Sequence, residues 1–191
     1  MVVVFVIAVC MTGVGCSAHT IDDPYLAEQS QLSGADNFAI ALALSSSEGN
    51  ATGTQIGDSG YRNIVLTEPY EDWLAAGLAA EFRRAGFQVE IDPVDGAGKV
   101  EMDVHIERLY GVRESGCKLV LDCTGASAIV EVELTDPRSG NRYGRRFVGY
   151  SSSQSYSMNT GDLEQDIRKA LTDAYAELVA ETHALLTSSM H

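Results

Sequence analysis

Apolar and polar residues alternate strictly in the middle of the chain, which is the pattern of a strand with one buried face. From Val100 to Ile106 every second residue is apolar, and the residues between them are acidic or histidine. The alternation recurs over residues 126–134, and a turn at residues 136–141 leads into a third strand at residues 142–153. Three long strands joined by short turns predict an antiparallel β-meander.

Arg108 interrupts the apolar side of the first of these strands. Tyr110 and Val112 continue that side in the same register. We therefore expect the strand to run on past an exposed or locally twisted Arg108, with Tyr110 and Val112 facing the core.

Two further segments repeat apolar residues at spacings of three and four, as amphipathic helices do. The first begins after Pro69 and ends at Gly86, with acidic residues in its first turn and arginines in its last, and Trp73 is a packing residue on its apolar stripe. The second covers residues 162–186. Both stripes need a sheet face to cover them, so the pattern predicts an α+β domain in which an antiparallel β-meander sheet packs against two helices.

The region ahead of the first helix is harder to assign. Residues 38–44 are continuously apolar and predict a buried strand, and residues 63–66 predict a short one. Between them, the segment from Ser45 to Gly60 is rich in serine, glycine, asparagine and threonine, which predicts a long, disordered loop whose role stays open. After the helix, residues 87–91 have the pattern of another strand.

The first sixteen residues combine an apolar run with a small-residue end, which is the order of a secretory leader. The run is shorter than the about 20 apolar residues of a spanning helix. Residues 13–16 (GVGC) resemble the lipobox of bacterial lipoproteins, in which the cysteine carries acyl chains such as palmitate and begins the mature chain. Gly13 stands where that family usually has leucine, and no Lys or Arg precedes the apolar run.

The lipobox resemblance implies a lipid anchor at Cys16, and Ser17 behind it implies export to the outer membrane. The alternative is a plain secretory signal with Cys16 as an ordinary thiol. The next residues are polar and without periodicity up to residue 36, as expected of a tether. The predicted organisation is therefore a leader over residues 1–15, a flexible tether over 16–36 and the α+β domain over 37–187.

Four cysteines are present, and Cys10 belongs to the predicted leader while Cys16 belongs to the lipid. Cys117 and Cys123 remain as a pair, which an exported protein would carry into an oxidising compartment. A disulfide between them requires the chain to turn, because bridged Cα atoms lie about 4.4–6.8 Å apart. A continuous strand over residues 118–122 would instead hold the thiols apart.

The net charge is −14, from 13 basic and 27 acidic residues. This argues against a nucleic-acid partner, which needs a basic surface. Four arginines nevertheless fall within nine positions, and such a patch is suited to an anionic partner; they are Arg138, Arg142, Arg145 and Arg146. Strand alternation places Arg145 and Arg146 on opposite faces, and pairing with the protein's own carboxylates accounts for the set as well.

No arrangement of residues indicates catalysis. Five serines between residues 151 and 157 lack a Gly-x-Ser-x-Gly turn or a nearby histidine. The acidic residues at positions 92, 95, 101 and 103 do not have the spacing of a calcium loop, and the histidines at positions 19, 105, 183 and 191 do not have that of a zinc site. The sequence therefore predicts no enzyme, no metal and no cofactor.

The order of elements from residue 37 to 186, with Ala85-Gly86-Phe87 after the first helix and VEMDVHIERLY at residues 100–110, resembles the YajG-like bacterial lipoproteins. The resemblance implies a lipid-anchored protein of the outer membrane that faces the periplasm and has no assigned reaction. We expect a binding or assembly module with an envelope protein as partner. One alternative is an auxiliary lipoprotein of an envelope ABC-type lipid transporter; another is a serine hydrolase, which needs a histidine within reach of a serine.

Overall fold

A computed structural model describes residues 19–21, 31–47, 51–57, 60–66, 70–93, 98–118, 121–156 and 160–188. It is one sheet of eight strands with two α-helices and a short 3-10 helix, η1. The elements are β1 (His19–Ile21), η1 (Ala35–Asn37), β2 (Ala39–Ser46), β3 (Ala51–Gly57), β4 (Gly60–Leu66), α1 (Tyr70–Ala85), β5 (Gln88–Ile91), β6 (Val100–Lys118), β7 (Leu121–Thr135), β8 (Arg142–Ser155) and α2 (Thr160–Ser188).

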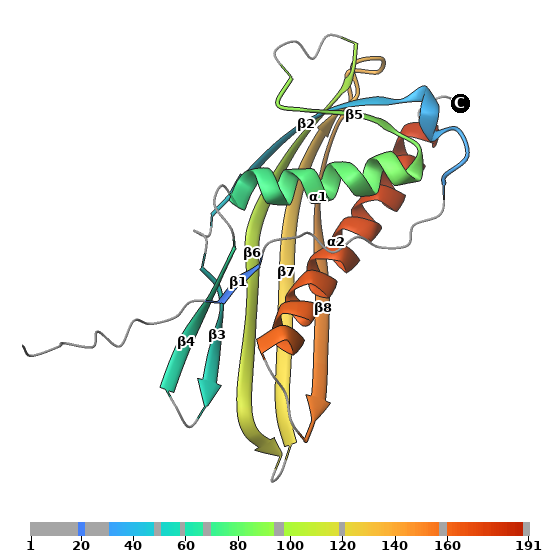
Figure 1. The fold of residues 1–191 in the computed structure, drawn as a ribbon. Helices are drawn as coiled ribbons and strands as arrows, with labels where there is room; N and C mark the ends of the chain where they lie inside the picture. The colour runs from blue at the N-terminus through green and yellow to red at the C-terminus, as the bar shows by residue number, and fades with distance from the viewer. Residues whose placement is uncertain are drawn as a thin grey trace, which may run out of the picture.

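Strand β6 is the centre of the sheet (Figure 1). Its first part pairs in parallel with β2, its later part pairs in parallel with β3, and its other edge pairs with β7. Strands β6, β7 and β8 form the predicted antiparallel meander, and each is longer than the alternating pattern alone indicated.

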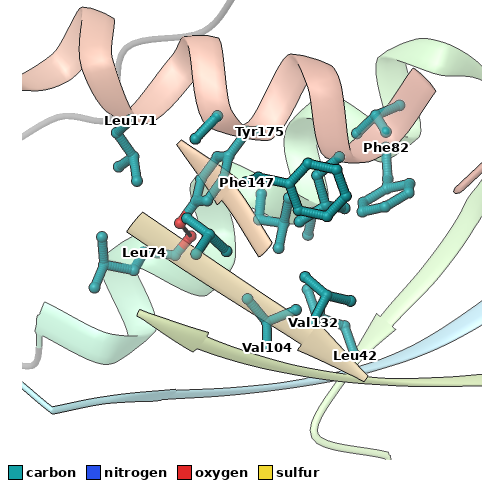
Figure 2. Packing of buried hydrophobic residues seen from close by; sticks show 14 of the residues in the cluster. Leu42, Leu74, Phe82, Val104, Val132, Phe147, Leu171 and Tyr175 are labelled. Atoms are coloured by element: carbon teal, nitrogen blue, oxygen red, sulfur yellow. Dashed lines mark hydrogen bonds between the residues drawn. The ribbon is translucent and has the colours of Figure 1, made fainter. Parts of the chain in front are cut away.

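Both helices cover the same face of the sheet, with α1 over β2 and β5 and α2 along β7 and β8 (Figure 1). Their apolar stripes and the inward side chains of the strands form a single core, in which Trp73 is a packing residue as predicted. Figure 2 shows how Tyr175 of α2 reaches across this core, where its hydroxyl donates to the main-chain oxygen of Leu74 in α1 at 3.2 Å. The predicted α+β architecture is therefore confirmed.

Helix α2 lies directly on the strand backbone at two glycines. A Cβ atom at Gly149 of β8 would lie 1.8 Å from the main-chain oxygen of Ala170, and a Cβ at Gly111 of β6 would lie 2.7 Å from the Ile167 side chain. Any larger residue at Gly149 would push the helix away, so this glycine sets how closely helix and sheet pack.

The predicted register beyond Arg108 is wrong. The pairing of β6 with β7 shifts between Ile106 and Arg108, which is the signature of a β-bulge. The extra residue reverses the alternation, so Leu109 faces the core while Tyr110 is only half-buried on the other face.

The prediction of a loop from Ser45 to Gly60 is also wrong. Ser45 and Ser46 end β2, residues 51–57 form β3, and β4 begins at Gly60, ahead of the short strand predicted at residues 63–66. Strand β3 is held between two neighbours, β4 and β6, so main-chain hydrogen bonds supply an order that its weakly apolar side chains did not indicate.

The folded part of the chain begins ahead of residue 37. Within the predicted tether, residues 19–21 pair with β4, and Ala35 is fully buried in the core. The main-chain nitrogen of Leu32 donates to Ala85 at the end of α1 at 2.8 Å. Neither described helix has the length and apolar character needed to cross a membrane. The predicted leader and Cys16 lie outside the described residues.

Candidate binding surface on the open face of the sheet

The side of the sheet turned away from both helices carries the most exposed part of the meander, and we call it the open face. No described helix packs on it, and its side chains come from alternate positions of β2, β6, β7 and β8. Its residues are Ala41, Ala43, Ser45, Glu101, Asp103, His105, Glu107, Arg108, Tyr110, Val112, Gly125, Ser127, Ile129, Glu131, Glu133, Thr135, Arg142, Gly144, Arg146, Val148, Tyr150 and Ser152.

The first half of the open face is charged and hollow. Asp103 and Glu133 are direct cross-strand partners, and their outer neighbours in the same row are Ala43 and Gly144. Because these flanking residues are small, a hollow of about 650 Å³ opens around the two carboxylates. Like charges directly opposite each other on a sheet are destabilising, so this row costs the fold stability.

The next row of the open face contains the histidine and an ion pair. His105 contacts two serine hydroxyls, Ser45 Oγ at 2.9 Å from Nδ1 and Ser47 Oγ at 2.5 Å from Nε2. Across the row, Arg146 binds both carboxylate oxygens of Glu107 at 2.8 and 3.0 Å and lies 3.9 Å from Glu131. The arginine charge is therefore matched to a carboxylate within the chain.

The second half of the open face, beyond the bulge, is aromatic. Tyr110 and Tyr150 stand on either side of Ser127 in one row, and Gly125 lies in the next row. A hollow of about 480 Å³ lies among them. The Tyr150 side chain is 68% exposed, which is unusual for a residue of this size in a strand. The Arg108 guanidinium lies 5.6 Å from the centre of the Tyr110 ring.

The four predicted patch arginines do not converge. Arg145 points to the helix side, where it binds Glu181 of α2 at 2.9 Å, whereas Arg146 lies on the open face, so the predicted opposite orientation of these two residues is correct. Arg138 donates to the main-chain oxygen of Asn37 at 3.1 Å and lies over the Phe38 ring. Arg142 lies at the rim of the open face, in the same row as Thr135. Pairing with the protein's own groups explains most of this set, and a single anionic-partner site is not formed.

Cys117 and Cys123 are joined by a disulfide in the structure, with Cα atoms 6.0 Å apart. Lys118 at the end of β6 pairs with Leu121 at the start of β7, so the chain turns between the two cysteines. The alternative of a continuous strand over residues 118–122 is therefore wrong.

Two serines near the end of β8 hold helix α2 against the sheet. Ser151 and Ser153 donate to the Asp166 carboxylate at 2.5 and 3.1 Å, and Thr124 donates to the same carboxylate. Asp166 is buried at the N-terminal part of α2, so these hydroxyls fasten the helix to the sheet.

The Ser–His contacts at His105 were not visible in the sequence, because Ser45 and Ser47 lie some sixty positions from the histidine. Both ring nitrogens face hydroxyls, and no carboxylate contacts the ring among the described residues, so the orienting member of a catalytic triad is not found there. His183 contacts the Ser33 main-chain oxygen at 2.9 Å instead. Within the described ranges no group of His, Cys, Asp and Glu is arranged to hold a metal ion.

The open face as a site was missed by sequence reasoning, although part of its signal is present. The acidic alternate positions of β6 were correctly interpreted as solvent-facing. Only the pairing of strands shows that Gly125 and Gly144 lie on the same face as these residues, beside the two hollows.

The sequence matches no known protein family and no curated protein. Solved structures share its fold. A crystal structure of a Xanthomonas campestris protein from the family DUF330 aligns with a TM-score of 0.62 at 14% identity and covers 90% of this chain and 99% of that chain. An uncharacterised protein aligns with a TM-score of 0.53 at 14% identity, over 89% of this chain and 99% of that chain.

A minor lipoprotein from Acinetobacter baumannii is also similar, with a TM-score of 0.44 at 13% identity, over 75% of this chain and 92% of that chain. The structural neighbours thus include a DUF330 protein and bacterial lipoproteins. At these identities the likeness extends to the fold alone, and the narrower resemblance to YajG-like lipoproteins stays a prediction.

Proposed function

We propose that this protein is a lipid-anchored binding module of the bacterial cell envelope, held at the outer membrane through Cys16 and facing the periplasm, with no catalytic activity. The observation that carries the proposal is the open face. Both helices cover one side of the sheet, while the other side is exposed and hollowed. A face that only needed to be soluble would do best with large polar side chains, whereas this one exposes Tyr150 beside small residues.

The chemistry of the open face supports binding rather than reaction. Its one histidine lacks a carboxylate partner among the described residues, and Arg146 is engaged by Glu107. Aromatic residues and arginine are the side chains that contribute most to protein–protein interfaces, and both are present beside the second hollow.

The anchor is tested by intact mass and membrane fractionation of the full chain and a Cys16→Ala variant in a bacterial host. We expect the wild-type protein in the outer membrane, with a mature mass that begins at Cys16 and includes acyl chains. The variant should carry no lipid. An unmodified wild-type protein in the soluble fraction would refute the anchoring part of the proposal.

The binding role is tested by replacing Ser152, an exposed residue beside the second hollow, with the photocrosslinking residue p-benzoylphenylalanine. The matched control carries the same residue at Glu177, which is exposed on α2. We expect crosslinks to an envelope component from position 152 and not from position 177. Crosslinking to transporter subunits would favour the auxiliary-lipoprotein alternative, and no crosslink from position 152 would refute a binding role for the open face.

A further inference from the structure

Among the glycines of β6, β7 and β8, the surroundings of four are described, and only two of these four are explained by packing inside the chain. Gly111 and Gly149 face α2, where a Cβ atom would collide with the helix. Gly125 and Gly144 face the other way, and a Cβ atom at either would have no atom within 4 Å. Neither has a positive φ that would require glycine.

A glycine inside a strand lowers stability, because it has no side chain to pack and it loses more backbone freedom on folding. Where no internal contact requires it, such a glycine often marks a place where a ligand or another backbone approaches closely. Gly144 lines the charged hollow and Gly125 lines the aromatic one. Each of the two unexplained glycines therefore lines a hollow of the open face.

The charge of the first hollow indicates what approaches it. Asp103 and Glu133 repel each other across the strands, and both are exposed. Two arginines of the open face flank this row on β8: Arg146 is bound to Glu107 through both carboxylate oxygens, and Arg142 lines a neighbouring hollow with Asp103 and Glu133. A cation from a partner, placed between the two carboxylates, would remove the repulsion and gain two charge-assisted contacts.

The hollows lie in line along the strands. Glu133 and Ser127 are six positions apart on β7, which corresponds to about 20 Å at 3.3 Å per residue. An extended segment of a partner therefore needs about six residues to reach from one hollow to the other. A second copy of this chain is a poor occupant, since each copy carries a net charge of −14.

We propose that the open face binds an extended, positively charged segment of a partner protein, which lies over Gly144 and Gly125. A lysine or arginine of the segment sits between Asp103 and Glu133. An apolar or aromatic residue farther along packs against Tyr150. This inference names the partner chemistry of the binding module and rests on the proposed function.

The probe is a displayed library of random peptides of about twelve residues. Peptides are selected for binding to the mature chain, which has its tether and domain but no lipid. Peptides that also bind the Gly144→Leu variant are then removed. The affinities of selected peptides are then measured by fluorescence polarisation for Gly144→Leu, Gly125→Leu and Glu133→Lys. The control variant is Asp173→Lys, an equal charge reversal on the exposed side of α2. Thermal melting of each variant confirms that it is folded.

We expect selected peptides rich in lysine or arginine, with an affinity that falls about tenfold or more for each open-face variant and less than about twofold for the α2 control. Their affinity should also fall with added salt. The inference is overturned if no peptide is selected, if the selected peptides lack a positive charge, or if the open-face variants bind them as the wild-type protein does. Self-association that Gly144→Leu abolishes, seen by analytical ultracentrifugation, would overturn it in favour of a second copy.

The two proposals fail in different ways. If crosslinks from position 152 persist in cells but the peptide results are negative, the open face is a binding surface for a partner of another chemistry. If those crosslinks are also absent, the proposed binding function itself is wrong.

Discussion

Gly149 offers the sharpest test of how the helix and the sheet are held together. In Gly149→Ala the new Cβ atom would lie 1.8 Å from the Ala170 main-chain oxygen and 2.8 Å from the Ala174 main-chain nitrogen. Ordinary contacts of this kind begin at 3.4 Å. Both neighbours are backbone atoms of a helix, so neither can rotate away, and α2 itself must retreat from β8.

The cost follows from the packing that this retreat disrupts. A gap of about 0.5–1 Å already forfeits a quarter to a half of the dispersion energy of each contact, and α2 contributes a long row of buried side chains to the core. Overpacking typically costs about 1–3 kcal/mol. Because the obstacle is backbone, we expect Gly149→Ala to lie at or above the top of that range, near 3 kcal/mol. For a chain of this length such a loss lowers the Tm by about 6–12 °C.

Two matched variants give the expected order. At Gly111 the new Cβ would meet the flexible ends of Ile167 and Leu163, which can rotate, so Gly111→Ala should cost about 1 kcal/mol. At Gly144 nothing lies within 4 Å, and Gly144→Ala should be neutral or stabilising by about 0.4–1 kcal/mol. Urea unfolding followed by circular dichroism measures all three. A Gly149→Ala protein as stable as the wild type, or less affected than Gly111→Ala, would refute this account of the helix–sheet contact.

Three further predictions concern groups inside or beside the core. Burial raises the pKa of the Tyr175 phenol well above its ordinary value of 10.0, so only the unfolded state loses this proton just above that pH. Above about pH 10, the free energy of unfolding of the wild-type protein should therefore fall with pH more steeply than that of Tyr175→Phe, by about 1.4 kcal/mol per pH unit. Urea unfolding at several pH values measures both slopes, and equal slopes would contradict the burial of this phenol. Asp166→Ala removes the acceptor of three hydroxyls and should lower the free energy of unfolding by about 2–4 kcal/mol. The control Asp173→Ala removes a carboxylate that binds an exposed lysine one helical turn away, and chemical unfolding should show a loss of less than about 0.5 kcal/mol. Replacing both Cys117 and Cys123 by serine should lower the free energy of unfolding by about 2 kcal/mol, which is the loop-closure contribution of a disulfide across so short a loop. If a reductant leaves the Tm of the wild-type protein unchanged, the disulfide is not formed in solution.

The sequence was sufficient for the parts of the fold in which one pattern dominates. The alternation in β6 from Val100 to Ile106 and the helical stripes of α1 and α2 each have a single good arrangement, because shifting them would expose apolar residues. Strand β3 had no such pattern. Its order comes from hydrogen bonds to β4 and β6, which are far from it in sequence, so no local signal reveals it.

The site was less predictable than the fold, because it depends on register. That Asp103 lies on a solvent face follows from alternation within one strand, but its position opposite Glu133 and near Gly144 depends on how three strands pair. The contacts of His105 depend in the same way on its pairing with Ser45 of β2. A single sequence identifies the polar positions of a sheet and leaves open which of them meet.

The bulge in β6 connects these two aspects of the molecule. Without the bulge between Ile106 and Arg108, alternation carried unbroken through these same residues would turn Tyr110 into the core and Gly111 out of it. The bulky ring would then face α2 where the helix needs a glycine, and the open face would lose the aromatic residue that stands across Ser127 from Tyr150. The bulge thus allows the same strand to pack closely against the helix and to present an aromatic side chain on the opposite surface. The break in the hydrophobic pattern at Arg108 therefore permits the meander to serve both as core and as binding surface.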